Sequence, residues 1–299
     1  MNMQTDMEYN HEHPLRVMTL CSGYDSQCLA LERLKRDFPP FDYELVAWSE
    51  FEPETPNIPL EKQAAVRAHN ALFPQWADRN WGDMTKIDWE KVPDFDLLFY
   101  STPCQSISQA GLQHGFVEGS GTRSSIIWCV RDALKIKKPK YACLENVAAM
   151  VSSKFLPMFN LWREEVQKLG YNNFAEVLNA KDYGVPQNRE RIFLLSIRDD
   201  GENPQYYFPN KIKLKRKLKD ILEDDVDVKY YLNPNKVDQF VRDNMVMIEK
   251  YAREDDGEIE PLPEHLRKWL DEYPEDGGGE EQSDEQQEAG QDIFAESDE

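Results

Sequence analysis

Short apolar runs that alternate with helical patterns constrain the fold of this chain more than any other feature. Four runs with the length and composition of buried strands lie at residues 15–20, 43–48, 95–100 and 140–144. Segments with apolar residues at helical spacing separate them. Strands that alternate with helices favour an open α/β sheet with helices on both faces. Such sheets bind their ligands beyond the carboxyl ends of the strands.

Residues capable of chemistry follow these strands. Cys104 comes shortly after the third run, and Glu145 directly after the fourth. Gly23 lies in a turn after the first run, where the lack of a Cβ permits close approach of a ligand. Glu50 follows the second run, at the position where nucleotide-binding sheets hold the hydroxyls of a ribose. A solvated glutamate at the end of a strand is an equally good interpretation of Glu50.

Two further strands are predicted at 171–180 and 190–198, and the turn between them leads into Arg189 and Arg191. Alternation along a strand places both arginines on one face. Two guanidinium groups side by side suit a planar or phosphate acceptor. Residues 106–121 form a loop of sixteen residues without a periodic pattern, a length that is typical of a mobile lid or a binding loop.

Helices are predicted at 60–73 and 122–137, where apolar residues recur at helical spacing. We expect one face of the first helix to carry Ala64, Ala65, Ala68 and Leu72. We expect the second to bury Ile126, Ile127, Val130 and Leu134.

Negative charge is concentrated at the end of the chain. Residues 251–299 carry 19 acidic and 3 basic side chains, or −16 of the formal net charge of −21. This balance argues against a generally basic nucleic-acid binder, because affinity for phosphates comes largely from Lys and Arg. The basic run at 211–219 allows a local exception. It is interpreted either as a salt-bridged surface element or as a segment that contacts phosphates.

The five cysteines form no CxxC pair and are odd in number, so neither a zinc site nor a disulfide framework is indicated. Reduced thiols in a cytoplasmic protein are the expectation. No apolar run approaches the roughly 20 residues needed to cross a bilayer, and no membrane contact is expected. The predicted organisation is a flexible leader at 1–14, a catalytic and cofactor-binding domain at 15–200, a weakly defined extension at 201–270 and a disordered acidic tail at 271–299.

Three motifs, taken in order, resemble the DNA (cytosine-5)-methyltransferase family over about residues 15–232. They are Pro103-Cys104-Gln105, Glu145-Asn146-Val147 and Gln187-Asn188-Arg189-Glu190-Arg191. Any one of them could arise by chance, but all three in the family's order favour membership strongly. The resemblance implies a Rossmann-like methyltransferase sheet, S-adenosylmethionine as cofactor and a cytosine in DNA as substrate, as in restriction–modification methylation.

The resemblance also implies roles for four catalytic residues. Cys104, as a thiolate, would attack C6 of cytosine and make C5 nucleophilic toward the methyl group of the cofactor, with a helix end or a cation favouring the thiolate. Glu145 would donate to the ring at N3, and a closed, poorly solvated pocket would favour its protonated form. Arg189 and Arg191 would orient the base and brace the loop that carries Cys104.

Cofactor-binding positions transfer from the family less evenly. The candidates are Cys21, Gly23, Tyr24, Glu50, Phe51, Asp83, Met84 and Pro103. Phe51 is expected to pack on adenine, and Asp83 to accept a hydrogen bond from an exocyclic amine. Cys21 replaces the family's usual aromatic residue, and Asp25 and Ser26 replace its later glycines.

The family's target-recognition region and its Gly-Asn-containing C-terminal segment are not recognised in this sequence. Extruding a base from a duplex costs a few kcal/mol, which contacts to DNA normally offset. We therefore hypothesise a truncated or split enzyme that needs a second polypeptide. Two alternatives stay open: a methyltransferase of RNA cytosine, and a catalytically impaired relative that works as a binding protein. A nicotinamide-dependent dehydrogenase is disfavoured, because no GxGxxG motif follows the first strand.

Overall fold

The computed structural model describes residues 8–104, 107, 115–224, 226–227, 230 and 236. The chain divides into two units, Met1–Ile221 and Leu222–Glu299, and nearly all of the described residues belong to the first. Half of the loop expected at 106–121 and the whole acidic tail expected at 271–299 lie outside the described residues, so the expectations for them stay predictions.

One six-stranded sheet organises the first unit. Its strands are β1 (Leu15–Leu20), β2 (Tyr43–Ser49), β3 (Leu97–Tyr100), β4 (Tyr141–Val147), β5 (Tyr171–Asn179) and β6 (Glu190–Arg198). The spatial order is β2-β1-β3-β4-β6-β5. The first four strands are parallel, and β6 runs antiparallel to both β4 and β5. Each strand was predicted to within three residues, and β4 extends further than expected, so that Glu145 lies inside the strand.

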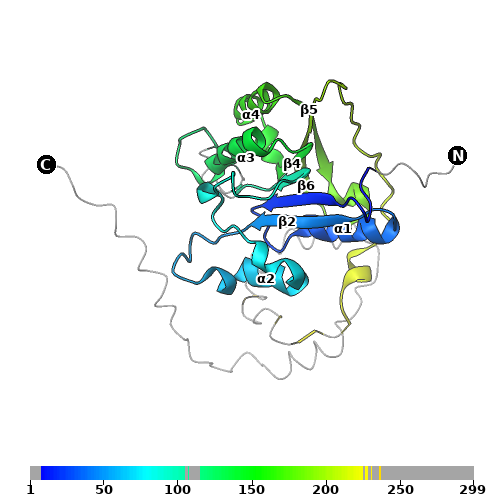
Figure 1. The fold of residues 1–299 in the computed structure, drawn as a ribbon. Coiled ribbons are helices and arrows are strands. Elements are labelled where there is room, and N and C mark those ends of the chain that lie inside the picture. The colour runs from blue at the N-terminus through cyan, green and yellow to red at the C-terminus, as the bar shows by residue number, and fades with distance from the viewer. Residues whose placement is uncertain are drawn as a thin grey trace. The chain divides into compact units, whose positions relative to one another are not determined.

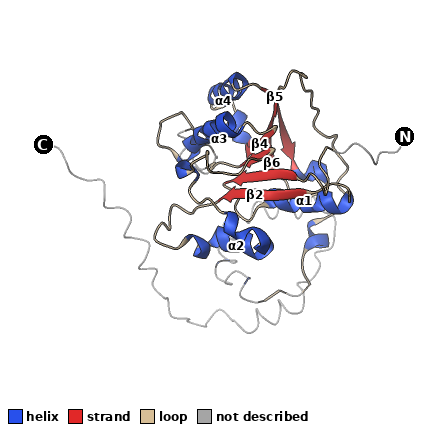
Figure 2. Ribbon diagram, in the orientation of Figure 1, coloured by secondary structure: helices blue, strands red, loops and turns tan. Residues whose placement is uncertain are grey.

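Helices cover both faces of this sheet, as predicted (Figure 1). α1 (Ser26–Asp37) and α2 (Ala64–Leu72) lie on one side, and α3 (Val130–Lys137) and α4 (Leu156–Lys168) on the other. Figure 2 shows the sheet between these two helical layers. Short 3-10 helices occupy η1 (Leu60–Lys62), η2 (Pro74–Arg79), η3 (Met84–Lys86), η4 (Arg123–Cys129), η5 (Ala148–Val151), η6 (Ala180–Tyr183) and η7 (Leu218–Ile221).

Two hydrophobic cores result from the alternation of side chains along the strands. In β1, Met18 packs with α3 and α4 in one core, whereas Val17 packs with α1 and α2 in the other. Trp162 of α4 is fully buried in the first core, where its ring meets Tyr100 and Trp128 edge to face. The cores fix the helices against the sheet and leave its ends free for a site.

The buried face of α2 is not the one that carries the alanines. Val66 and His69 are the buried residues of this helix, whereas Ala64 and Leu72 are exposed. The ring of His69 stacks on Trp48 of β2 with 3.6 Å between ring centroids. Burial of a valine and an aromatic ring removes more apolar surface from water than burial of alanines, so this rotation of the helix is favoured.

Helix α4 provides a direct test of the first core. We expect Trp162→Ala to lower the free energy of unfolding by about 3–5 kcal/mol, because it leaves a large cavity in a fully buried site. Leu161→Ala, on the same helix at a side chain that is 54% exposed, is the matched control and should change stability by less than about 0.5 kcal/mol. Urea denaturation measures both, and equal losses would contradict the assignment of the core.

Candidate active site

The carboxyl ends of the parallel strands meet at one edge of the sheet. The backbone of Cys21, just after β1, donates to Ser49 at the end of β2, with 2.9 Å between nitrogen and oxygen. The backbone of Ser101, just after β3, donates to Leu20 at 3.1 Å. The segments that follow β1, β2 and β3 therefore begin side by side.

Two buried side chains hold the segment that leads to Cys104. The amide nitrogen of Asn146, in β4, donates to the carbonyl oxygen of Thr102 at 3.0 Å. The hydroxyl of Ser124, in η4, donates to the carbonyl oxygen of Pro103 at 2.8 Å. Cys104 itself is partly exposed. The thiol therefore follows two carbonyl groups whose positions are fixed from two different elements.

Glu145, the neighbour of Asn146 in β4, meets both predicted arginines. Arg191 Nε lies 3.0 Å from Glu145 Oε1, and Arg189 Nη2 lies 4.0 Å from the same oxygen. The register explains this, because Glu145 stands opposite Phe193, two residues beyond Arg191 in the antiparallel β6. The structure thus brings together three of the four residues predicted to be catalytic.

Two expectations about this group stay predictions, because residues 105, 106 and 108–114 lie outside the described residues. The side chain of Glu145 is 29% exposed. Neither Arg189 nor Arg191 makes a hydrogen bond or ion pair with residues 101–104 in the part of the chain that the structure describes. Asn146 and Ser124 brace that segment. Only the position of Asn146 within its motif pointed to it, and no sequence signal pointed to Ser124.

A tight turn after β1 faces the end of β2. Cys21, Gly23 and Asp25 all have positive φ, between 53° and 65°. The Gly23 nitrogen donates to Glu50 Oε2 at 2.6 Å, and the Phe51 nitrogen donates to Glu50 Oε1 at 3.0 Å. Burial raises the pKa of Glu50, although both backbone bonds oppose this shift. An added Cβ on Gly23 would meet no atom within 4 Å, so one side of the turn is open.

The remaining cofactor candidates lie around Cys21 and the start of η3. The Cys21 thiol contacts the sulfur of Met84 at 3.4 Å. Burial, followed by the charges of Glu50 and Asp83, raises the pKa of Cys21, which keeps this cysteine a thiol. Tyr24 is 54% exposed.

Asp83 caps η3, since its Oδ1 accepts bonds from the nitrogen and the hydroxyl of Thr85. Lys86 Nζ lies 3.1 Å from the other oxygen. Burial favours a higher pKa for Asp83, but these bonds outweigh it and lower the pKa. The same Lys86 lies 5.8 Å from the centre of the Phe51 ring, so Phe51 and Asp83 flank one cation.

This donor set suits S-adenosylmethionine. Glu50 and Asp83 bring two carboxylates and Phe51 an aromatic ring to this part of the chain, and the turn at Gly23 leaves room for a ligand. Among the described residues, no cluster of three or more His, Cys, Asp or Glu could hold a metal ion. All five cysteines are free, and burial raises the pKa of Cys143 to about 12.

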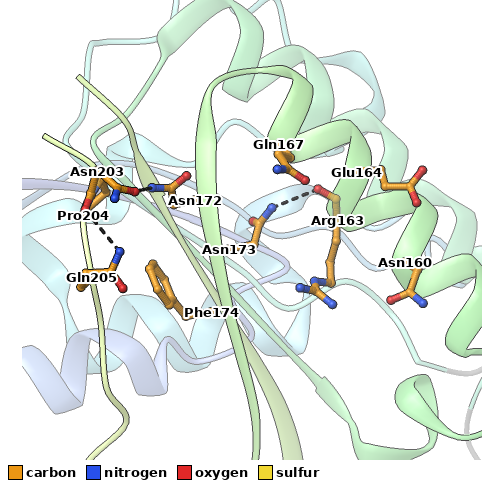
Figure 3. Close-up of a pocket in the computed structure, with 10 residues that line it drawn as sticks. All are labelled: Asn160, Arg163, Glu164, Gln167, Asn172, Asn173, Phe174, Asn203, Pro204 and Gln205. Carbon is orange, nitrogen blue, oxygen red and sulfur yellow. Dashed lines mark hydrogen bonds between the residues drawn. The ribbon is translucent and has the colours of Figure 1, made fainter. Parts of the chain in front are cut away.

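A groove of about 500 Å³ lies elsewhere, beside the beginning of β5 (Figure 3). Amide side chains from α4, β5 and the segment after β6 dominate its walls: Asn160, Gln167, Asn172, Asn173, Asn203 and Gln205. Because β5 runs parallel to β4, this groove lies at the amino ends of the strands. It contains none of the predicted site residues.

The basic run at 211–219 is exposed, with no regular secondary structure before Leu218, where η7 begins. Lys211 pairs with Asp182 at 2.7 Å, and the Ile212 nitrogen donates to the Asp182 carbonyl at 2.8 Å. These contacts attach the start of the run to η6, which precedes the arginine turn. The ion pair of Lys211 agrees with the interpretation of this run as a salt-bridged surface element. The alternative, that the run contacts phosphates, stays a prediction.

Comparison with known proteins identifies relatives of this site and fold. The family model for C-5 cytosine-specific DNA methylase matches residues 15–287. The type II methyltransferase M2.ScrFI of Lactococcus lactis subsp. cremoris is 36% identical over 264 residues, which is 75% of this chain and 71% of that protein. The orphan methyltransferase M.Rho11sI of Bacillus phage rho11s is 33% identical over 255 residues, which is 76% of this chain and 47% of that protein.

Solved structures share the fold. A DNMT2 variant from Spodoptera frugiperda superposes with a TM-score of 0.54 at 18% identity, over 73% of this chain and 62% of that one. S. pombe Dnmt2 gives 0.52 at 19% identity, over 75% of this chain and 64% of that one. The fold is the Rossmann-like one of S-adenosylmethionine-dependent methyltransferases.

The extent of these matches bears on the end of the chain. The family model matches up to residue 287, whereas the resemblance based on the three motifs covered only about residues 15–232. The absence of a target-recognition region stays a prediction. The chain spans about half the length of several relatives. Because the family model matches most of the chain and M2.ScrFI aligns over more than two thirds of both proteins, the chain belongs to the C-5 cytosine-specific DNA methylase family.

Proposed function

We propose that this chain transfers a methyl group from S-adenosylmethionine to C5 of a cytosine in DNA, through a covalent bond between Cys104 and C6. One observation carries the proposal. Asn146, next to Glu145 in β4, hydrogen-bonds the carbonyl of Thr102, two residues before Cys104. This bond ties the thiol segment and the Glu145–Arg191 pair to the same edge of the sheet.

The reaction begins when the Cys104 thiolate adds to C6 of the ring. The Sγ–C6 bond forms, and the electron pair of the C5–C6 double bond moves to C5. S-adenosylmethionine, when bound, would supply the electrophilic methyl group that accepts the electron pair at C5, and its sulfonium sulfur would keep the electrons of the broken bond to that methyl group. A water molecule then takes the C5 proton, the electron pair of the C5–H bond restores the C5–C6 double bond, and the Sγ–C6 bond breaks to release the Cys104 thiolate.

Glu145 and the two arginines hold the base during this addition. A hydrogen bond from the Glu145 carboxyl group to N3 offsets the negative charge that develops in the ring as sulfur attacks. Arg191, 3.0 Å from Glu145, fixes the direction of that carboxyl group, and Arg189 lies close enough to reach an oxygen of the base. Such a fork of donors suits the planar O2 side of cytosine.

Cofactor binding falls to the residues around the turn at 21–25. Glu50 accepts the ribose hydroxyls with the lone pairs that its backbone bonds leave free, and Phe51 packs on the purine. Asp83 accepts from the exocyclic amine. Cys21, Tyr24, Met84 and Pro103 shape the walls of the cofactor site.

The setting of the chain is inferred from its thiols and helices. All five cysteines are free, in keeping with a reducing compartment, and we propose the cytoplasm. No helix in the described part of the chain is long and apolar enough to cross a membrane. The comparisons lend no support to a second polypeptide, and activity of the purified chain alone would contradict that hypothesis.

A trapping assay tests the proposed reaction. With duplex DNA that contains 5-fluorocytosine, and S-adenosylmethionine present, we expect a covalent protein–DNA adduct, because fluorine cannot leave C5 as a proton does. Cys104→Ser should abolish the adduct and lower methyl transfer by at least about 10³-fold. Denaturing gels and transfer of labelled methyl groups measure the two effects.

The control is Cys129→Ser, which changes a partly buried thiol that is not among the proposed catalytic residues and should leave the adduct intact. A Cys104→Ser protein that still forms the adduct would refute the proposed nucleophile. An adduct with RNA that contains 5-fluorocytosine, but none with DNA, would instead favour the RNA alternative.

The bond between Asn146 and Thr102 makes a second prediction. Asn146→Ala should lower kcat by about 10²-fold, because small displacements of a reacting group have effects of that size. The dissociation constant for S-adenosylmethionine should stay within about twofold, because Asn146 has no contact with the turn at 21–25.

Asn173→Ala is the matched control for Asn146→Ala. Asn173 also donates from its side-chain amide to a backbone carbonyl, that of Arg163, at 3.0 Å, but at the opposite end of the sheet. Its loss should reduce stability by about 1–2 kcal/mol and leave kcat unchanged. Equal effects of the two variants on kcat would show that Asn146 acts only through stability.

A further inference from the structure

A fully buried polar cluster lies beneath the turn at 21–25. Asp25 and His69 have no exposed surface. Asp25 Oδ2 accepts a hydrogen bond from the Thr19 hydroxyl at 2.8 Å and lies 3.5 Å from His69 Nε2. The His69 ring stacks on Trp48 at 3.6 Å. β1, β2, α2 and the turn thus meet at one buried carboxylate.

This carboxylate needs partners. A buried charge is stable only when neighbouring groups compensate for its lost hydration. Thr19 provides one hydrogen bond, and the buried thiol of Cys28 lies close enough for Asp25 to raise its pKa, after the larger effect of burial. Asp25 Oδ1 and His69 Nε2 make no regular hydrogen bond. His69 Nε2, 3.5 Å from Asp25 Oδ2, is therefore the ring nitrogen that faces this buried carboxyl group.

The backbone of the turn also needs support. Cys21 and Asp25 are in the left-handed region, which costs a side-chain-bearing residue roughly 1–2 kcal/mol. Such conformations persist where the surrounding structure determines them. Asp25 stands where the family has a glycine. Bonds of its side chain to the interior therefore replace the conformational freedom that a glycine would provide.

The cluster is linked to the cofactor candidates on both sides. Gly23, two residues before Asp25, donates to Glu50 at 2.6 Å. Glu50 follows Trp48 by two residues, and Trp48 carries the stacked ring of His69. A shift of His69 or Asp25 therefore moves the Gly23 nitrogen relative to the Glu50 carboxylate.

We infer that Asp25 and His69 form a positioning pair for S-adenosylmethionine, which fixes the turn at 21–25 against the end of β2. The inference rests on the proposed function, because it concerns the cofactor of that reaction. Neither residue touches the ligand, since both are fully buried. Their effect is on the affinity for the cofactor and not on the chemistry at Cys104.

A double-mutant cycle tests the pair in the full chain, with titration calorimetry of S-adenosylmethionine as the readout. We expect His69→Gln to weaken binding about tenfold, because glutamine lacks the ring that stacks on Trp48 and so does not hold a nitrogen in place beside the buried Asp25 carboxyl group. Asp25→Gly should bind within about threefold of the wild type, since glycine adopts the turn without strain. The double variant should match Asp25→Gly, so that removal of the carboxylate rescues the loss.

Two further measurements separate positioning from general damage. At saturating cofactor, the kcat of His69→Gln should equal that of the wild type, whereas its KM for S-adenosylmethionine should rise about tenfold. The control is His11→Gln, which breaks an exposed His–Asp pair with Asp42 and should leave cofactor affinity unchanged.

Each outcome decides a different point. Unchanged affinity in His69→Gln overturns the inference alone, and so does a double variant that binds more weakly than Asp25→Gly. If His69→Gln does not fold, the comparison of the double variant with Asp25→Gly still decides. A wild-type chain that binds no S-adenosylmethionine contradicts the proposed function and the inference together, whereas failure to trap DNA with normal cofactor affinity contradicts only the reaction.

Discussion

The parallel pairing of β1 with β2 and β3, and of β3 with β4, is the constraint on which the site depends. It brings the carboxyl ends of four strands to one edge, so that residues far apart in sequence become neighbours. The ladder ends in bonds from Cys21 to Ser49 and from Ser101 to Leu20, which start the functional segments from fixed points. The cores above and below the sheet hold the strands in this register.

Beyond the ends of the strands, hydrogen bonds from single polar side chains, and not the backbone bonds of the sheet, hold the loops in place. Asn146 and Ser124 hold the thiol segment, Glu50 holds the turn at Gly23, and Asp25 holds the same turn from below. A buried hydrogen bond contributes only about 1 kcal/mol net, but leaving one partner unsatisfied costs about 1–3 kcal/mol. These bonds therefore specify one geometry for the loops more strongly than they stabilise the fold.

The sequence predicted the strands well, because buried strands are local apolar runs. The candidate catalytic residues were recognised from short motifs at the ends of these strands. The hydrogen-bond partners of the segments that carry them were harder to predict. Ser124 is distant in sequence from Pro103, and no local pattern links them. The spacing of the alanines in α2 did not indicate which face is buried. The stacking of His69 on Trp48 decides it, and periodicity does not report on tertiary contacts.

The exposure of Glu145 bears on how the protein and a bound base would each contribute to the environment of this carboxyl group. The described residues leave this carboxyl group 29% exposed, although Arg191 already fixes its direction. A cytosine that entered beside it would remove the remaining water, and loss of water strengthens every electrostatic interaction in the site. In the proposed reaction, the protein would thus orient the donors before binding, and the base itself would supply the low-dielectric surroundings in which they act. On this proposal an extruded base is the expected substrate, because a stacked base cannot displace that water.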